Sequence, residues 1–500
     1  MKCVHTIRFI TRVERLACIA LLLAGPLLFT GCALGPKYQP RAVLAPPAYK
    51  ETGNWKTAQP NDQNLGGNWW EIFQDLQLNA LEEQIDVSNQ NLKVAVAQYQ
   101  ESRAALRYVR ADYYPTVSTS PSATRERYSN NRPPQSSNFD GLTFNDFALP
   151  VNFSYQANIW GRVSRNVEAH REQAQATAAD LAVINLSMHS ALAIDYFAAR
   201  TLDAEEKLLH DTVAQYEQAL QLNEDRYQGG LASEVEVEQA RTILETTRAQ
   251  LVDVGVARAQ YEHAVAVLVG KTPADFTLPP LPLTAPPPAI PVGIPSELLE
   301  RRPDIAAAER RVASANAEVG LARTAYYPLV NIVGGGGFES GSITTLLQGP
   351  SAMWSVGASL VQPLFDGGRR RALNDEAKAA YGSEVASYRE TVLTGFQQVE
   401  DNLAALRILE KETGVQTAAV QAAQRSLDLS NTRYDGGVTS YLEVITAQNA
   451  ALTDEVTAVN ILGRRMASSV LLIEAMGGGW DRRSLPDRPE CCGKLAMGDD

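Results

Sequence analysis

An internal duplication constrains this chain more than any other feature of its sequence. One set of landmarks recurs at a constant offset: Asn91, Leu92, Ala95, Ala104 and Tyr113-Tyr114-Pro115 match Asp304, Ile305, Ala308, Ala317 and Tyr326-Tyr327-Pro328. A second pair, residues 226–233 (RYQGGLAS) and 433–440 (RYDGGVTS), follows in the same order with the offset six residues shorter. The matching order predicts one structural unit written twice, with extra residues in the first copy.

The two repeats fall within a chain that composition divides into six segments. These are an export signal (1–31), an extended N-terminal segment (32–68), repeat 1 (69–271), a connector (272–295), repeat 2 (296–476) and a C-terminal tail (477–500). The connector is dense in proline, which stops helices and favours an extended chain. The tail is rich in glycine and then charged.

The N-terminus has the composition of a bacterial export signal. Basic residues precede an apolar core that ends in Phe29-Thr30-Gly31-Cys32. This apolar core is too short for a typical membrane-spanning helix. Small residues before a cysteine resemble a lipoprotein signal, so Cys32 is expected to be acylated and to become the new N-terminus. Ala33 after it implies sorting to the outer membrane. The alternative is an ordinary cleaved signal that happens to contain a cysteine, and the adjacent Cys491 and Cys492 lie in the tail without a predicted role.

Each repeat reads as helix, strand, strand, long helix, helix. The long helices, 162 to about 225 and 369 to about 434, are built mainly from good helix formers. Each would extend on the order of 90–100 Å at 1.5 Å per residue. Helices of this length must pack side by side as a coiled-coil-like array. Shorter helices, 233 to about 269 and 440 to about 476, follow the Gly-Gly turns.

The predicted strands carry a membrane signal. Residues 151–159 alternate apolar and polar side chains at every step, and residues 354–360 occupy the same place in the second copy. About nine to eleven residues span a bilayer in a barrel. With a weaker strand ahead of each, the chain has four, and four strands cannot close a barrel alone. Because open edges are not tolerated in lipid, several copies must complete it. The alternative is a soluble amphipathic sheet.

Other classes of function find little support. The chain carries 45 basic and 57 acidic residues. This acidic balance argues against nucleic acid as a partner, because binding to phosphates requires a clustered basic surface. The five histidines are scattered without metal-ligand spacing, and no nucleophile elbow or Walker loop occurs. Beyond the signal, no run approaches eighteen continuous apolar residues, so no membrane-spanning helix is expected there. We therefore predict no enzyme activity, no cofactor and no metal site.

These features together resemble the TolC/OprM-type outer-membrane efflux proteins, in particular their lipoprotein, NodT-like branch. The landmarks are Cys32 with Gly35-Pro36-Lys37-Tyr38, Trp69-Trp70-Glu71-Ile72-Phe73, Ile159-Trp160-Gly161-Arg162, Arg302-Pro303-Asp304-Ile305, Pro363-Leu364-Phe365-Asp366-Gly367-Gly368 and the two Arg-Tyr-x-Gly-Gly elements. The resemblance implies a mainly α fold with a membrane β-barrel portion. Three chains would each give four strands to a 12-stranded transmembrane barrel and long helices to a periplasmic α-barrel.

The resemblance also implies partners and a location. The homotrimer would lie in the outer membrane of a Gram-negative bacterium, with a large periplasmic portion. It would dock a periplasmic adaptor (membrane fusion protein) of a tripartite system whose inner-membrane pump supplies the energy. The channel itself would be a passive exit duct for drugs or other small molecules.

The tip turns, residues 226–233 and 433–440, hold the candidate functional residues. Gly229, Gly230, Gly436 and Gly437 form the turns, and Gly230 and Gly437 suit left-handed positions. Ser233 and Ser440 can each cap the next helix, with Glu236 and Glu443 at the capping-box spacing. That structural role explains both glutamates without any channel function.

The resemblance adds a gating role to these turns. It places Glu443 at an acidic constriction that favours cations, with Thr446 at the second position of that constriction, where relatives can have an acid. It also pairs Tyr434 with Glu236 as a gate contact. A further gate contact uses a basic residue where this chain has Thr439, which puts that link in doubt.

Three hypotheses remain open from sequence. The first is an efflux duct for small molecules, and the second is an exit duct for type I protein secretion. The third is a periplasmic structural lipoprotein that conducts nothing. The sequence names neither the exported substrate nor the pump and adaptor.

Overall fold

The structure, a computed structural model, describes residues 35–39, 46, 48–51, 67–129, 141–290 and 300–485. The predicted signal, Cys32, Cys491 and Cys492 lie outside these residues. The chain forms two compact units. We call them the sheet unit (Met1–Arg41, Gln100–Ala174, Glu309–Ala386) and the helical unit (Ala42–Tyr99, Gln175–Ala308, Ser387–Asp500), and describe each by itself.

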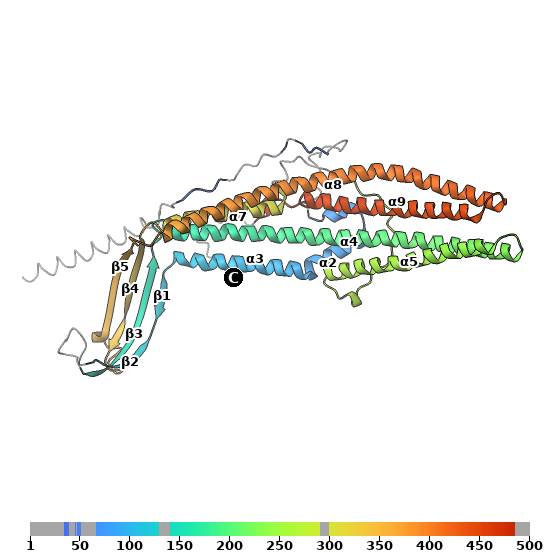
Figure 1. The fold of residues 1–500 in the computed structure, drawn as a ribbon. Coiled ribbons are helices and arrows are strands. Elements are labelled where there is room, and N and C mark those ends of the chain that lie inside the picture. The colour runs from blue at the N-terminus through green and yellow to red at the C-terminus, as the bar shows by residue number, and fades with distance from the viewer. Residues whose placement is uncertain are drawn as a thin grey trace, which may run out of the picture. The chain divides into compact units, whose positions relative to one another are not determined.

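The sheet unit contains one antiparallel sheet (Figure 1). Its strands are β1 (Thr116–Thr119), β2 (Ser122–Arg127), β3 (Thr143–Gln156), β4 (Leu329–Ser340) and β5 (Ala352–Val361). The order is β1-β3-β4-β5, and β2 also pairs with β3. Thr119 lies opposite Val151 and Ser122 opposite Ala148, so β1 and β2 share one register. They form a single strand position interrupted at Pro121, because proline has no N–H to donate.

Helical segments pack beside one another in the same unit. They belong to α3 (Gln90–Arg110), α4 (Arg162–Gln228), α7 (Pro303–Thr324) and α8 (Arg369–Asp435). Val109 of α3 packs against Val163 and Val167 of α4. The hydroxyl of Ser314 in α7 donates to the Ala169 carbonyl oxygen at 2.9 Å. Short side chains such as these let α7 lie close to α4.

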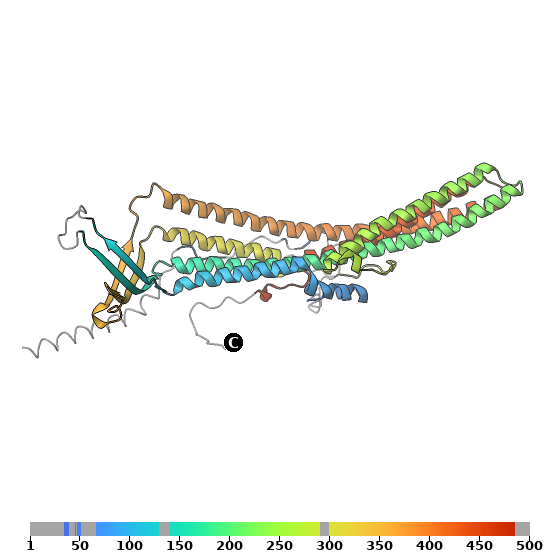
Figure 2. The ribbon, with the colours of Figure 1, turned by 90° about the horizontal axis from the view of Figure 1, so that it is seen from below.

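The helical unit contains the remainder of α4 and α8 with α2 (Leu76–Ser88), α5 (Glu234–Leu268) and α9 (Tyr441–Ala475). α4 and α8 are each 67 residues long, and α5 and α9 are each 35. Each long helix turns back into its shorter partner, and the two helical hairpins lie side by side (Figures 1 and 2). A shared apolar core joins the hairpins through Ala240, Tyr434, Tyr441 and Val444.

Two helices are apolar enough to cross a membrane by length and composition. α4 and α9 each contain an 18-residue window of mean hydropathy 1.3, although neither contains a continuous apolar run of that length. A packed core helix passes the same test. In α9, Ile461, Val470 and Ile473 are buried against the rest of the unit.

A buried polar cluster fastens α2 to α4 inside the helical unit. Glu82 and His189 are both fully or almost fully buried, and His189 Nδ1 lies 2.7 Å from Glu82 Oε2. The other ring nitrogen lies 3.3 Å from Asp86 Oδ1, and the Trp70 ring stacks on the imidazole at 4.4 Å. Burial raises the pKa of Glu82 to about 7, although the hydrogen bond and the charge of His189 act to lower it.

Candidate functional site

The two faces of the sheet differ in polarity. On one face, Val151 and Phe153 of β3 flank β4, and Trp354 and Val356 of β5 continue the same rows. Their side chains are exposed, with Trp354 at 83% and Val356 at 78%. The opposite face presents the alternate, mainly polar positions Asn152, Ser154, Gln156, Ser355 and Ser359. A wall of this kind suits lipid on one side and water on the other.

The sheet also has two open edges. Among the described strands, β5 pairs only with β4, and β1 and β2 pair only with β3. An unpaired strand edge leaves backbone N–H and C=O groups without partners, which hydrocarbon does not tolerate. Each edge therefore needs another strand if this sheet enters a membrane.

Glycines in β4 let the backbones of β3 and β4 approach closely. A Cβ on Gly337 would lie 2.2 Å from the Leu149 carbonyl oxygen and 2.9 Å from the Pro150 Cα. A Cβ on the neighbouring Gly336 would meet only ordinary contacts, the nearest at 3.7 Å. Gly337 is thus required by packing, whereas Gly336 is not.

Both tip turns have the same backbone geometry. Gly230 (φ +72°) and Gly437 (φ +71°) adopt the left-handed conformation expected for them. Leu231 N–H donates to the Arg226 carbonyl oxygen at 2.7 Å, and Val438 N–H donates to that of Arg433 at 2.9 Å. These are the bonds of a Schellman motif, which satisfies the last carbonyls of a helix and allows a tight reversal. Gly229 and Gly436 each donate to the carbonyl four residues back and complete the turns.

The candidate gate tyrosine, Tyr434, is buried between the hairpins at 5% exposure. Its hydroxyl donates to Asn223 Oδ1 of α4 at 2.5 Å, and the Arg226 guanidinium lies 4.4 Å from its ring centroid. The predicted gate partner, Glu236, also lies within hydrogen-bonding reach of this hydroxyl. Burial raises the pKa of Tyr434, and the negative charge of Glu236 raises it further. Glu236 therefore acts on Tyr434 through its charge and through a side-chain hydrogen bond.

The two equivalent glutamates have different partners. Glu236 accepts a hydrogen bond from the Ser233 backbone N–H at 3.3 Å, as in a capping box. Glu443 instead accepts from Arg433 Nη1 at 2.7 Å and from the Thr439 hydroxyl. Capping therefore explains Glu236 and does not explain Glu443. Thr446, one turn further along α9, is exposed, and its hydroxyl donates to the Leu442 carbonyl oxygen.

Sequence reasoning did not single out three of these contact residues: Asn223, Arg226 and Arg433. The two arginines carried a signal, since both begin the repeated Arg-Tyr-x-Gly-Gly element. Asn223 carried none, because the corresponding position of the second copy is Ser430.

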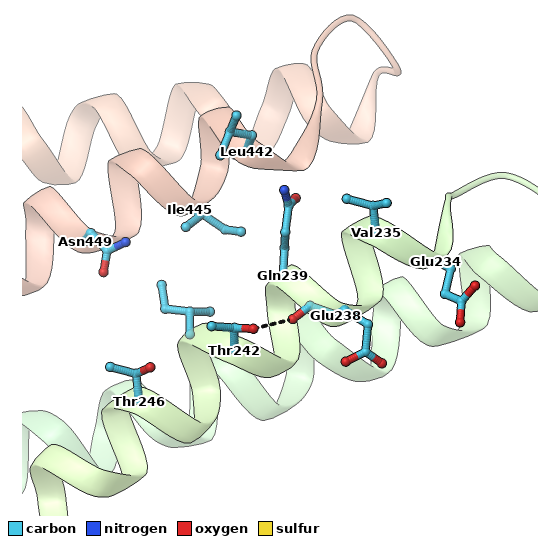
Figure 3. A pocket seen from close by; sticks show the side chains of 10 residues that line it. Glu234, Val235, Glu238, Gln239, Thr242, Thr246, Leu442, Ile445 and Asn449 are labelled. Carbon is cyan, nitrogen blue, oxygen red and sulfur yellow. Dashed lines mark hydrogen bonds between the residues drawn. The ribbon is translucent and has the colours of Figure 1, made fainter.

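A groove lies between α5 and α9 beside the tip turns (Figure 3). Its volume is about 650 Å³. Glu234, Glu238 and Thr242 line it from α5, whereas Leu442 and Ile445 line it from α9. α5 also contributes Val235 and Ile243, so acidic, polar and apolar side chains line the groove together.

The residues that follow Cys32 are held on α4 and α7 in the sheet unit. The Gly35 carbonyl oxygen accepts from Arg165, and the Pro36 carbonyl oxygen accepts from Asn316. The Tyr38 hydroxyl donates to Glu309 at 2.8 Å.

The sequence and the fold match known channel proteins. Residues 81–271 and 294–478 match the family described as Outer membrane efflux protein. The chain is 31% identical over 458 residues to the probable efflux pump outer membrane protein TtgC of Pseudomonas putida, covering 90% of this chain and 93% of that protein. It is 29% identical over 469 residues to the cation efflux system protein CusC of Escherichia coli, and the match covers 93% of this chain and 98% of that protein.

Solved structures give the same result. The outer-membrane channel OprN superposes with a TM-score of 0.84 at 27% identity, covering 90% of this chain and all of that one. The CmeC outer membrane channel of Campylobacter jejuni superposes with a TM-score of 0.83 at 25% identity, and the match covers 90% of this chain and 96% of that one. These matches confirm the predicted fold class of very long helices with a four-position antiparallel sheet per chain. The chain therefore belongs to the outer membrane efflux protein family, a non-enzymatic family, and is the outer-membrane channel of a tripartite efflux system in a Gram-negative bacterium.

Proposed function

We propose that three copies of this chain form a lipid-anchored exit duct, and the open-edged sheet with one apolar face is the observation that carries this proposal. Pairing the β5 edge of one copy with the β1 edge of the next would leave no edge in lipid. Three copies with four strand positions each give a 12-stranded barrel. The two repeats, 69–271 and 296–476, would supply equivalent parts of the wall.

Bilayer conductance tests the duct. Purified full-length protein reconstituted in a planar bilayer should give discrete ion-conducting steps, and its cross-linked form should migrate as a trimer. The third hypothesis, a structural lipoprotein, predicts no conductance. A silent bilayer with both the wild type and the gate variant Tyr434→Phe would refute the duct.

We propose that the anchor is a lipid on Cys32. The support is the sequence Phe29-Thr30-Gly31-Cys32, in which small residues precede a cysteine at the end of the apolar signal. Cys32→Ser should lose incorporation of labelled palmitate while the protein still folds. Palmitate entering the variant at the wild-type level would refute acylation at this residue.

The tip turns are the proposed docking surface for a periplasmic adaptor, with an inner-membrane pump completing the system. Cysteines introduced at Gly229 and Gly436, which need no left-handed conformation, should cross-link to the adaptor. A cysteine at Gly414, in the middle of α8, is the matched control and should not. Equal cross-linking at all three positions would count against docking at the tips.

The proposed cargo is small molecules. The matching relatives are named for efflux of cations, antibiotics and toluene. The neighbouring genes test this cargo: a drug or metal pump encoded alongside supports it, whereas a secretion transporter with a protein substrate would overturn it.

We further propose that Glu443, with Thr446 one turn later, lines the narrowest part of the duct. Its support is its place on the first turn of α9, directly after a tip turn. Glu443→Gln should weaken block by multivalent cations such as hexaamminecobalt, because a carboxylate that can bind the cation is lost. Unchanged block would remove Glu443 from the constriction.

A further inference from the structure

The inference concerns the charge of Glu443 and rests on its proposed place at the constriction. Both carboxylate oxygens of Glu443 are engaged within one tip turn. Oε1 accepts from Arg433 Nη1 at 2.7 Å, and Oε2 accepts from the Thr439 hydroxyl. The carboxylate therefore lies beside a full positive charge from its own chain. Three copies would present three such pairs, and their net charge would be zero.

The first tip turn shows that this arrangement is specific to the second. Its equivalent glutamate, Glu236, folds back to the Ser233 backbone N–H. Its equivalent arginine, Arg226, crosses to the other hairpin, where it lies over the Tyr434 ring and 3.8 Å from Asp435. Two equivalent arginines thus have different functions: Arg226 joins the hairpins, and Arg433 covers an acid.

Sequence differences between the two turns accompany the asymmetry. Asp435, the acid near Arg226, corresponds to Gln228 in the first copy, so Arg433 has no equivalent acid on the other hairpin. Thr439 stands where the first copy has Ala232, and only threonine offers a hydroxyl to the glutamate. Glu443 accepts from that hydroxyl and from Arg433, whereas Glu236 accepts from the Ser233 backbone N–H. The capping box is lost at the second turn, and an ion pair forms in its place.

The pair is accessible to water and therefore easily separated. The side chains of Arg433 and Glu443 are 54% and 38% exposed. Exposed ion pairs contribute little to stability, so Arg433 does not hold the fold together. Its charge nevertheless stays next to Glu443 and offsets the field that a cation would meet.

We propose that Arg433 is a specificity-determining residue of the duct, which neutralises Glu443 and so suppresses cation selectivity at the tip. Removing its charge exposes three uncompensated carboxylates. Arg433→Gln should raise the ratio of cation to anion permeability on the order of fivefold, the Boltzmann factor for one unit charge at about 4 Å in water. The increase should shrink at high salt, because ions screen exposed charges.

The test measures reversal potentials of the purified full-length channel in planar bilayers under a KCl gradient. Glu443→Gln leaves Arg433 without its acid and should lower the permeability ratio, whereas the double variant Arg433→Gln/Glu443→Gln, again neutral at this pair, should return it close to the wild-type value. Arg433→Lys keeps the charge and should resemble wild type. Arg248→Gln removes an exposed arginine paired with Glu217 and Glu245 on α4 and α5, and serves as the matched control.

The outcomes separate the two proposals. If Glu443→Gln changes selectivity and Arg433→Gln does not, the constriction stands and the role of Arg433 is refuted. If neither changes it, Glu443 does not lie at the conducting neck, and both proposals fail. A shift in Arg433→Lys as large as that in Arg433→Gln would mean that the guanidinium acts through packing rather than charge, and would overturn the inference.

Discussion

The hydroxyl of Tyr434 donates a hydrogen bond to the buried side-chain oxygen of Asn223, at 2.5 Å. The two residues stand 211 positions apart and belong to α8 and α4. The bond thus ties the end of one helical hairpin to the end of the other. Any opening that separates the hairpins at their tips must break it.

Tyr434→Phe is expected to loosen the tips and increase single-channel conductance. The change leaves the Asn223 oxygen, in a residue only 1% exposed, without its donor. An unsatisfied buried acceptor costs about 1–3 kcal/mol. Tyr227→Phe is the matched control, because Tyr227 occupies the same position of the first repeat element and is 47% exposed. Equal conductance of the two variants would show that the Tyr434–Asn223 hydrogen bond does not hold the tips together.

Alanine at Gly230 or Gly437 is expected to destabilise the tip turns by about 1–2 kcal/mol each, because a side chain disfavours positive φ. A Cβ at either position meets nothing within 4 Å, so the loss would be conformational only. Gly414→Ala in α8, also in open space, should instead stabilise the protein by about 0.5–1 kcal/mol. Thermal melting followed by circular dichroism checks the signs, and a stabilising Gly437→Ala would contradict the assignment.

Gly337→Ala is expected to impair assembly of the sheet. The added Cβ would stand 2.2 Å from a backbone oxygen of β3, and backbone cannot move aside as a flexible side chain can. Gly336→Ala, with its nearest contact at 3.7 Å, should assemble normally. The yield of heat-modifiable trimer in outer-membrane fractions measures the difference. Comparable yields from the two variants would show that β3 and β4 are not held as described.

Glu82→Gln is expected to flatten the pH dependence of stability. The folded pKa of Glu82 is raised to about 7 from 4.5. The folded state therefore binds the proton more tightly, and stability is lost as pH rises from about 4.5 to about 7. The loss approaches about 3 kcal/mol, at 1.36 kcal/mol per pKa unit. Melting curves at pH 5 and pH 8 check it, with the exposed Glu83→Gln as control. An equal pH slope in wild type and Glu82→Gln would exclude this group as its source.

The sequence by itself determined the large elements. Predicted helix ends at about 225, 269, 434 and 476 compare with observed ends at 228, 268, 435 and 475. Local rules suffice here, because long runs without proline propagate as helix and Gly-Gly pairs permit left-handed turns. Alternation in residues 151–159 likewise identified β3, which extends from Thr143 to Gln156. The break at Pro121, which splits the first strand position, and the break at Asn89, which separates α2 from α3, were not anticipated.

Tertiary structure decided which side chains meet at the tips. At Tyr434, the packing of α4 against α8 adds Asn223 as a hydrogen-bond partner beside the predicted Glu236. Glu236 and Glu443 have the same local spacing, yet only Glu236 caps its helix. Hydrogen bonds and ion pairs depend on a few ångströms of relative placement, whereas helices and turns depend on dihedral preferences that each residue carries locally. The duplicated sequence therefore determined the helices and strands, whereas contacts between and within the hairpins determined which side chains pair at the tip turns.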